Sequence, residues 1–270
     1  MAHWIVVTDL DGTLLDHRYR FAAAEALIGR LEAAGIPVVP CSSKTAPEMR
    51  RFRRIAGLRS PFIVENGGAI HCQRTDLRWS PAGDHGCCDG ELVDCLGLPT
   101  QSLFPSLAAL SQDLALALEP LVEMSLDRVV ALTGLAPQAA SLALNRQWSV
   151  PFLPPANADV MALEQAAARR GLKVLQGNRF CHLIGSGCDK GLAVQRLRQR
   201  WLGGESRVLA LGDSPNDSAM LDSADLAVVV PGADGPHPRL LPAIRAGRYR
   251  LAAAPHAEGW AAAVAEAIDS

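Results

Sequence analysis

The sequence predicts an α/β protein with a parallel-sheet core and an inserted α/β cap. Three observations predict this fold: short apolar strand-like segments alternate with helical segments before residue 80, the alternation returns after residue 190, and the periodicity loosens between them. Alternating strands and helices favour a parallel sheet covered by helices. Because the two regular stretches lie far apart in the chain, we expect both to build one Rossmann-like core, with the cap inserted between them.

The amino-terminal stretch contains three expected strands separated by two expected helices. The strands cover residues 5–10, 36–39 and 62–64, and the helices cover about 21–34 and 45–56. The first strand is β-branched and apolar, which is typical of a buried parallel strand. Gly35 ends the first helix, and Thr45 with Glu48 has the spacing of a capping box at the start of the second.

The rest of the chain divides into an irregular middle and a regular end. Residues 80–100 predict an irregular linker, and the cap then contains helices near 104–118, 136–146 and 157–170 and strands at 129–132 and 173–176. The regular pattern returns with a helix at 191–201, strands at 208–211 and 226–230, and a helix at 258–268. We therefore assign residues 1–82 and 187–270 to the core and residues 83–186 to the cap.

Composition excludes several classes of function. The 270 residues are 49% hydrophobic and 20% charged, with a formal net charge of -2, so disorder is excluded as the main state. The chain has no excess of basic residues that would favour binding to nucleic acid. It also has no apolar run of about 18 residues that would favour a membrane-spanning helix. The seven cysteines show no zinc-site spacing and predict free thiols. Because the amino terminus resembles a strand and not a signal peptide, we expect a cytoplasmic protein; its oligomeric state is not predicted.

Polar side chains follow the expected strands at the ends where ligands bind in open parallel sheets. Asp9 and Asp11 follow the first strand, Ser42 follows the second, and Asp213 and Asp217 follow a later one. Lys190 begins the helix that precedes that later strand. All of these side chains should converge at one edge of the sheet.

The residue types at this edge suit phosphoryl transfer. Asp9 and Asp213 can supply oxygen ligands to Mg²⁺, and Asp9 can also attack phosphorus. Asp11, two residues further along an extended strand, would face the same way and act as acid and then base. Ser42 and Lys190 would hold the phosphoryl oxygens. Each residue alone is more often a turn, a cap or a surface group, but that interpretation does not explain all of them in this order.

These motifs resemble those of the haloacid dehalogenase superfamily. Its four motifs are matched by Asp9-Leu10-Asp11-Gly12-Thr13, Ser42, Lys190 and the segment from Gly212 to Asp217. The aspartate at the third position of the first motif, Asp11, makes that motif similar to the one in the phosphatase branch of the superfamily. The resemblance implies Asp9 as nucleophile and Asp11 as acid and base. It also implies Mg²⁺ held by Asp9, the Asp11 backbone carbonyl and Asp213, with Asp217 and Asn216 supporting the site.

A narrower resemblance is to the mannosyl-3-phosphoglycerate phosphatases, whose cap is of the α/β type. It rests on five segments, 42–45, 65–68, 132–135, 151–153 and 176–183. It implies a small phosphorylated sugar–glycerate substrate, bound by Ser42, Ser43, Lys44, Asn66, Gly67, Arg146, Arg179, His182 and Asn216. Arg179 and His182 would face one side of a strand. Gln147 and Val150 stand where that family tends to have Glu.

Three other functions stay open at this point. A phosphatase of glucosyl-3-phosphoglycerate or of another sugar phosphate would share all of these motifs. An isomerase similar to phosphomannomutase would also share them, but it would not release free phosphate. A non-catalytic metabolite-binding protein would have no need for the nucleophile Asp9 or for the intact set of Asp11, Lys190 and Asp213.

Overall fold

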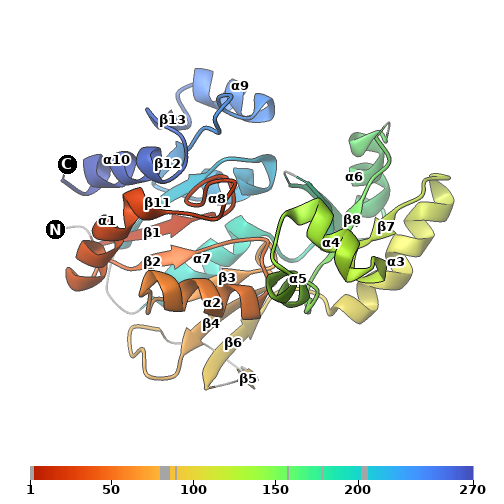
Figure 1. Cartoon of the computed structure of the whole chain (residues 1–270), viewed down its shortest axis with the longest axis horizontal. Coiled ribbons are helices and arrows are strands. Elements are labelled where there is room, and N and C mark those ends of the chain that lie inside the picture. Colours follow the sequence, from red (N-terminus) through yellow and green to blue (C-terminus); the bar gives the residue numbers. More distant parts are fainter. Residues whose placement is uncertain are drawn as a thin grey trace.

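The computed structural model describes residues 3–79, 86–88, 90–156, 158–177, 179–201 and 206–269. Five strands, all paired in parallel, form the central sheet of the core (Figure 1). In sheet order they are β13 (Arg250–Leu251), β12 (Leu226–Val229), β11 (Ser206–Gly212), β1 (His3–Thr8) and β2 (Val38–Pro40). The predicted parallel α/β core, built from both ends of the chain, is therefore confirmed.

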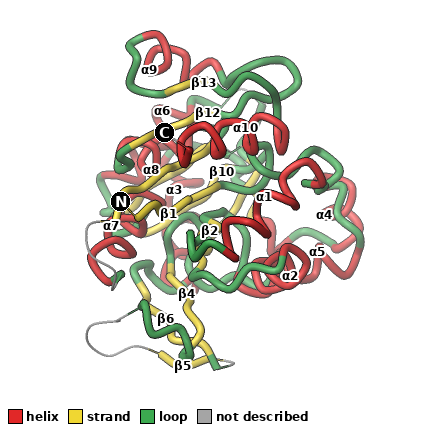
Figure 2. Tube along the Cα trace, turned by 90° about the vertical axis from the view of Figure 1, so that its left-hand side faces the viewer, coloured by secondary structure: helices red, strands yellow, loops and turns green. Residues whose placement is uncertain are grey.

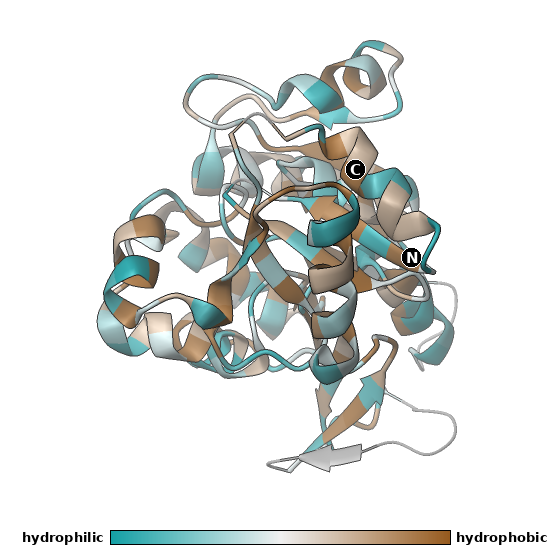
Figure 3. Ribbon diagram, turned by 90° about the vertical axis from the view of Figure 1, so that its right-hand side faces the viewer, coloured by the Kyte–Doolittle hydropathy of each residue, from teal (hydrophilic) through white to brown (hydrophobic). Residues whose placement is uncertain are grey.

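Helices cover both faces of this sheet. One face carries α1 (Ala22–Ala33), α2 (Ala46–Ala56) and α10 (His256–Asp269), and the other carries α7 (Lys190–Arg200), α8 (Ser218–Asp222) and α9 (Leu241–Arg245). Along β1, Val6 packs with the first group, whereas Ile5 and Val7 pack with the second. Both faces are buried, which explains why the strand is a continuous apolar run. Figure 3 shows the same pattern, with hydrophobic residues concentrated on the central strands.

A second, antiparallel sheet extends the core. Its strands are, in order, β3 (Phe62–Val64), β4 (Ala69–Gln73), β6 (Glu91–Cys95) and β5 (Gly86–Cys88). A parallel bridge between Cys41 and Ile63 joins it to the end of β2. Figure 2 shows β5 and β6 projecting from the body of the core. The prediction of an irregular linker over 80–100 was wrong for these strands, because pairing with β4 imposes strand structure that the local composition does not indicate.

The cap contains its own antiparallel sheet, β7 (Glu119–Pro120), β8 (Val150–Leu153), β10 (Cys181–Gly185) and β9 (Leu172–Gln176). Helices α3 (Thr100–Asp113) and α6 (Val160–Ala168) pack on it through a shared apolar cluster. The 3₁₀ turn η1 (Leu121–Glu123), α4 (Leu126–Thr133) and α5 (Pro137–Ala143) share a second, smaller cluster. Figure 1 shows these elements, in yellow and green, beside the core.

One expected cap strand is a helix. Residues 129–132 lie within α4, which begins after the N-cap Ser125 and ends at Gly134 with a left-handed φ of 70°. Val129 and Thr133 are buried one turn apart, so the helical period decides which side chains face the core. The β-branched residues suggested a strand, but two helix-capping signals outweigh that weak preference.

Most other predicted elements are confirmed. The capping box of Thr45 and Glu48 is present at the start of α2, and Gly35 follows the end of α1 with a φ of 73°. The five cysteines whose side chains are described, Cys41, Cys72, Cys95, Cys181 and Cys188, are free thiols, whereas the side chains of Cys87 and Cys88 lie outside the described residues. Among the described helices, none combines the length and the apolar character needed to cross a bilayer.

Candidate active site

Asp9 and Asp11 lie in the turn after β1, not on an extended strand as predicted. The strand ends at Thr8, and the chain folds back so that the Gly12 N–H donates to the carbonyl of Leu15 at 3.0 Å. Gly12 has a φ of 95°, which other residue types rarely adopt. The turn separates the two carboxylates: Asp9 is buried, whereas the Asp11 side chain is 42% exposed. The two aspartates therefore have different environments although they are two residues apart.

Lys190 holds the Asp9 carboxylate from beneath the site. Its Nζ lies 2.6 Å from Asp9 Oδ1 and 2.5 Å from Asp217 Oδ1, and its side chain is fully buried at the start of α7. Burial alone would lower the pKa of Lys190, but the carboxylates of Asp217 and Asp9 outweigh it and raise that pKa. Lys190 therefore remains a cation and can offset negative charge at this point of the site.

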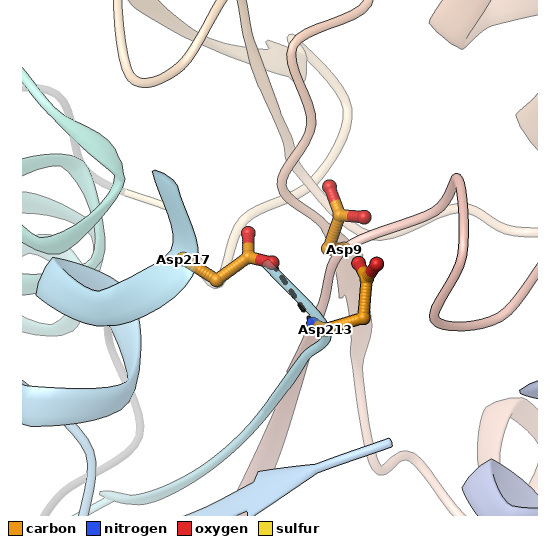
Figure 4. A group of neighbouring side chains, drawn as sticks. All are labelled: Asp9, Asp213 and Asp217. Atoms are coloured by element: carbon orange, nitrogen blue, oxygen red, sulfur yellow. Dashed lines mark hydrogen bonds between the residues drawn. The ribbon is translucent and has the colours of Figure 1, made fainter. Parts of the chain in front are cut away.

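Asp9, Asp213 and Asp217 form an acidic cluster in which one oxygen from each lies within 4.8 Å of the others (Figure 4). Asp217 Oδ2 accepts hydrogen bonds from the backbone N–H groups of Asp213 and Ser214, and its Oδ1 is bonded to Lys190. Both Asp217 oxygens thus have protein partners, which agrees with a supporting role. Asp213 also accepts a hydrogen bond from the hydroxyl of Thr13 at 3.0 Å.

The cluster fits a divalent cation held by Asp9 and Asp213. When ionised, three carboxylates and one ammonium leave two negative charges uncompensated, the charge that Mg²⁺ balances. Burial, opposed by Lys190 and reinforced by Asp217 and Asp213, raises the pKa of Asp9, and a dication would oppose this shift. The Asp11 carboxylate is not part of this cluster; the resemblance assigned its backbone carbonyl to the metal, not its side chain.

The loop after β2 forms the side of the site near Asp11. Lys44 Nζ lies 2.7 Å from Asp11 Oδ2 and 3.8 Å from Glu48 Oε1. Ser42 is buried beneath this loop, where its Oγ accepts a hydrogen bond from the Lys44 N–H at 3.3 Å. Ser43 lines the cavity, whereas Ser42 does not. The predicted phosphate-binding role of Ser42 stays a prediction.

The turn after β3 supports the opposite side. Asn66 Oδ1 accepts a hydrogen bond from Asn216 Nδ2 at 3.1 Å, which joins this turn to the turn after β11. Gly67 has a φ of 94°, and a Cβ there would lie 2.1 Å from the carbonyl oxygen of Asp189. Any larger residue would collide with the backbone at the start of α7. Gly67 therefore allows this turn to pack closely against Asp189 and Lys190. Neither Asn66 nor Gly67 lines the cavity, whereas Asn216 does.

A cavity of about 250 Å³ lies between this edge of the core and the cap. Residues of both regions line it, including the predicted Asp9, Asp11, Ser43, Lys44, Arg146, Arg179, His182 and Asn216. The prediction that Arg179 and His182 share a strand face was wrong. Strand β10 begins at Cys181, so Arg179 lies in the preceding turn. Both side chains nevertheless line the cavity.

The three cap residues differ in what they can offer a ligand. Arg146 donates to the backbone carbonyls of Ser43 at 2.6 Å and Ala143 at 2.9 Å, so it joins cap to core. Arg179 is exposed, and its Nη1 donates to the carbonyl of Thr133. His182 is buried; burial, and then the charges of Arg146 and Lys190, lower its pKa to about 3, so it is a neutral imidazole at physiological pH.

Sequence reasoning missed two residues that join the core to the cap. Glu65 is buried with a φ of 49°, and its carboxylate accepts the N–H of Gln147 at 2.9 Å, the N–H of Trp148 at 3.0 Å and the hydroxyl of Ser149 at 2.7 Å. Its place beside Asn66 in a motif was a signal that could have singled it out. Tyr19, which contacts Thr133, had no comparable signal.

Comparison with known proteins agrees with this geometry. The sequence profile of the haloacid dehalogenase-like hydrolases matches residues 6–81 and 164–235. A Persephonella marina protein named glucosyl-3-phosphoglycerate/mannosyl-3-phosphoglycerate phosphatase is 33% identical over 267 residues, which cover 95% of this chain and 94% of that protein.

Solved structures share the fold over nearly the whole chain. Thermoplasma acidophilum 0175 matches with a TM-score of 0.68 at 18% identity, covering 98% of each chain. The sucrose-phosphatase of Synechocystis sp. PCC6803, solved with sucrose and phosphate, matches with a TM-score of 0.62 at 19% identity and the same coverage. At these identities the likeness concerns the fold alone.

Proposed function

The chain belongs to the haloacid dehalogenase-like hydrolases and is a phosphatase, and from this premise we propose that it is a Mg²⁺-dependent hydrolase of mannosyl-3-phosphoglycerate. The products would be mannosylglycerate and phosphate. The observation that carries the reaction is the buried Asp9 carboxylate, held by Lys190 at 2.6 Å and grouped with Asp213 where the neighbouring strands β1 and β11 end. This arrangement combines a nucleophile, a cation and a metal-binding pair at one point.

The reaction would proceed in two steps. In the first step, the Asp9 carboxylate forms a bond to phosphorus while the bond from phosphorus to the glycerate ester oxygen breaks. Asp11 gives its proton to that leaving oxygen. In the second, Asp11 takes a proton from water, the water oxygen bonds to phosphorus, and the bond to Asp9 breaks. Lys190 offsets negative charge in both steps. Mg²⁺ held by Asp9 and Asp213 would stabilise charge on the phosphoryl oxygens.

The substrate assignment rests on the cavity and on the relative's name. A sugar–phosphoglycerate has a carboxylate away from its phosphate, and Arg179 on the cap side of the cavity has the guanidinium geometry that binds carboxylates. Neutral His182 can bond a sugar hydroxyl as donor or acceptor. The relative's printed name covers both glucosyl and mannosyl substrates, so the glucosyl compound is the second candidate.

A phosphate-release assay tests this proposal. With Mg²⁺ and no bisphosphate activator, both glycosyl-3-phosphoglycerates should exceed hexose phosphates in kcat/KM by at least about 10²-fold, since the hexose phosphates lack the carboxylate. Equal values for hexose phosphates would contradict the substrate class. A requirement for a bisphosphate, with no net release of phosphate, would indicate an isomerase instead.

We also propose the division into core and cap and a cytoplasmic location. The free thiols of Cys41, Cys72 and Cys188, all buried, fit a reducing compartment. Because β6 pairs with β4, we propose a first boundary after Cys95 in place of the predicted residue 83. Limited proteolysis that cuts near residue 97, and not near residue 83, would support this later boundary.

A further inference from the structure

We infer that Tyr19 is a positioning residue that couples the cap to the orientation of the Asp11 carboxylate, acting through Lys44. The inference rests on the proposed function, because it concerns how Asp11 serves as the acid. Its observation is a continuous set of contacts around the cavity: the Thr133 carbonyl, the Tyr19 hydroxyl and ring, the Lys44 ammonium and the Asp11 carboxylate.

The first contact in this set fixes the acid. Lys44 Nζ lies 2.7 Å from Asp11 Oδ2, whereas Asp11 Oδ1 is buried and has no hydrogen-bond partner in the described part of the chain. The Asp11 carboxylate, in a turn and 42% exposed, therefore has one strong contact that determines its rotation. Without Lys44 it would be free to rotate away from a leaving oxygen.

The second contact places Lys44. Its Nζ lies 5.1 Å from the centre of the Tyr19 ring, within the range of an attraction between a cation and an aromatic face. Glu48 Oε1, 3.8 Å from the same Nζ, also attracts it. The ring and Glu48 compete for the ammonium, so the ring helps decide whether Lys44 stays on Asp11 or turns toward Glu48.

The third contact places Tyr19 and comes from the cap. Its hydroxyl donates to the Thr133 carbonyl at the end of α4, at 3.0 Å, and Arg179 donates to the same carbonyl. Tyr19 itself has a φ of 59°, uncommon for an aromatic residue. Asp16 maintains this turn, since its Oδ1 accepts the N–H groups of Arg18 at 2.8 Å and Arg20 at 2.9 Å. A backbone held in such a conformation beside a site points to a functional constraint.

Movement of the cap away from the core would break the contact with Thr133 and release the Tyr19 ring. Lys44, and with it Asp11, would then lose its fixed position. Protonation of the leaving oxygen would thus be efficient only while the cap covers the cavity. A basic alkoxide leaving group needs that proton, whereas p-nitrophenolate leaves without it.

The test measures kcat/KM for aryl phosphates whose leaving groups rise in basicity from p-nitrophenolate to phenolate. These compounds have no carboxylate, so a loss of carboxylate binding cannot imitate the effect, and kcat/KM reports the steps up to leaving-group departure. For Tyr19→Phe and Tyr19→Leu, we expect a loss of about 10-fold or more on phenyl phosphate and of less than about 2-fold on p-nitrophenyl phosphate. Lys44→Met also removes a predicted phosphate-binding cation, so we expect losses on both substrates, with the loss on phenyl phosphate about 5-fold or more greater. Tyr249→Phe, which removes the hydroxyl of the chain's other tyrosine, bonded to Asp222 outside the site, should change neither value.

Two results would overturn the inference. Equal losses on both aryl phosphates in the Tyr19 and Lys44 variants would make these residues structural. No loss in any of the variants would show that these residues do not influence Asp11. Asp11→Asn separates this failure from failure of the proposed function. If Asp11→Asn selectively slows phenyl phosphate but the other variants do not, Asp11 is the acid and the coupling is absent. If Asp11→Asn has no such selectivity, the proposed role of Asp11 fails as well.

Discussion

The core side and the cap side of the cavity are built in different ways. On the core side, Asp9 and Asp217 are buried, and the buried ammonium of Lys190 is bonded to the side chain of each. On the cap side, Arg146 and Arg179 bond to backbone carbonyls of Ser43 and Thr133, and Arg179 is exposed. In the core, charged side chains therefore hold one another in place. In the cap, the arginine side chains are held by backbone carbonyls.

The difference shows where reaction and specificity reside. Buried charges that are bonded to a shared ammonium are held in place, so the core is preorganised for one type of chemistry. In the proposed reaction, the cap groups would contribute by closing over a ligand and bonding to its remote parts. Core variants should therefore impair every phosphate ester, and cap variants should impair some esters and not others.

The largest effect should follow the loss of the nucleophile. Asp9→Asn removes the attacking carboxylate and one proposed metal ligand, and we expect kcat to fall at least about 10³-fold on every substrate, with the fold intact. Phosphate release with mannosyl-3-phosphoglycerate and p-nitrophenyl phosphate measures this. Asp234→Asn, at an exposed aspartate, is the matched control. Near-normal activity of a folded Asp9→Asn protein would contradict the account.

Metal removal should also affect all substrates alike. A chelator should abolish phosphate release and Mg²⁺ should restore it, because three carboxylates with oxygens within 4.8 Å of one another need a compensating cation. Asp213→Ala should raise the Mg²⁺ concentration that gives half-maximal activity about 10-fold or more, since it removes one of the proposed ligands. Full activity in the presence of the chelator would exclude this part of the account.

Arg179→Ala should separate the cap from the core. We expect kcat/KM for mannosyl-3-phosphoglycerate to fall roughly 10²-fold, or about 2.7 kcal/mol, and that for p-nitrophenyl phosphate to change little. Arg169→Ala, an exposed cap arginine that does not line the cavity, should leave both values unchanged. Equal losses on the two substrates would place Arg179 in the phosphate site and remove the contrast between the regions.

The smallest effect should come from the junction between the regions. In Glu65→Gln an amide NH₂ replaces an oxygen that accepts hydrogen bonds from the segment 147–149, so at least one buried donor loses its partner. We expect a loss of about 1–3 kcal/mol, seen as a lower Tm. The exposed Glu266→Gln serves as control, and an unchanged Tm in both variants would show that Glu65 does not stabilise the junction.

The sequence predicted the core side well because strand ends determine it. Once β1 and β11 are parallel neighbours, Asp9 and Asp213 must lie close together. Lys190 lies at the same edge of the sheet because it is the first residue of α7, the helix that precedes β11. The acidic cluster and the lysine therefore needed little beyond the order of elements. The separation of Asp9 from Asp11 was not predicted, because the strand ends at Thr8, two residues earlier than expected.

The cap side was harder to predict for a physical reason. The positions of Arg146 and Arg179 depend on bonds to carbonyls distant in sequence, such as those of Ser43 and Thr133. Nothing in the local pattern indicates such partners. The same applies to Glu91, whose burial depends on Arg50 and His71 and which lies in a segment that was expected to be irregular.

The most direct test of the central claim is to trap the phosphorylated enzyme. The protein and mannosyl-3-phosphoglycerate are mixed with Mg²⁺, quenched in acid within one turnover, digested, and analysed by mass spectrometry. The account predicts a phosphoryl group on the peptide that contains Asp9, absent from the Asp9→Asn protein. Turnover with no phosphorylated peptide, or with the phosphoryl group on another residue, would contradict it.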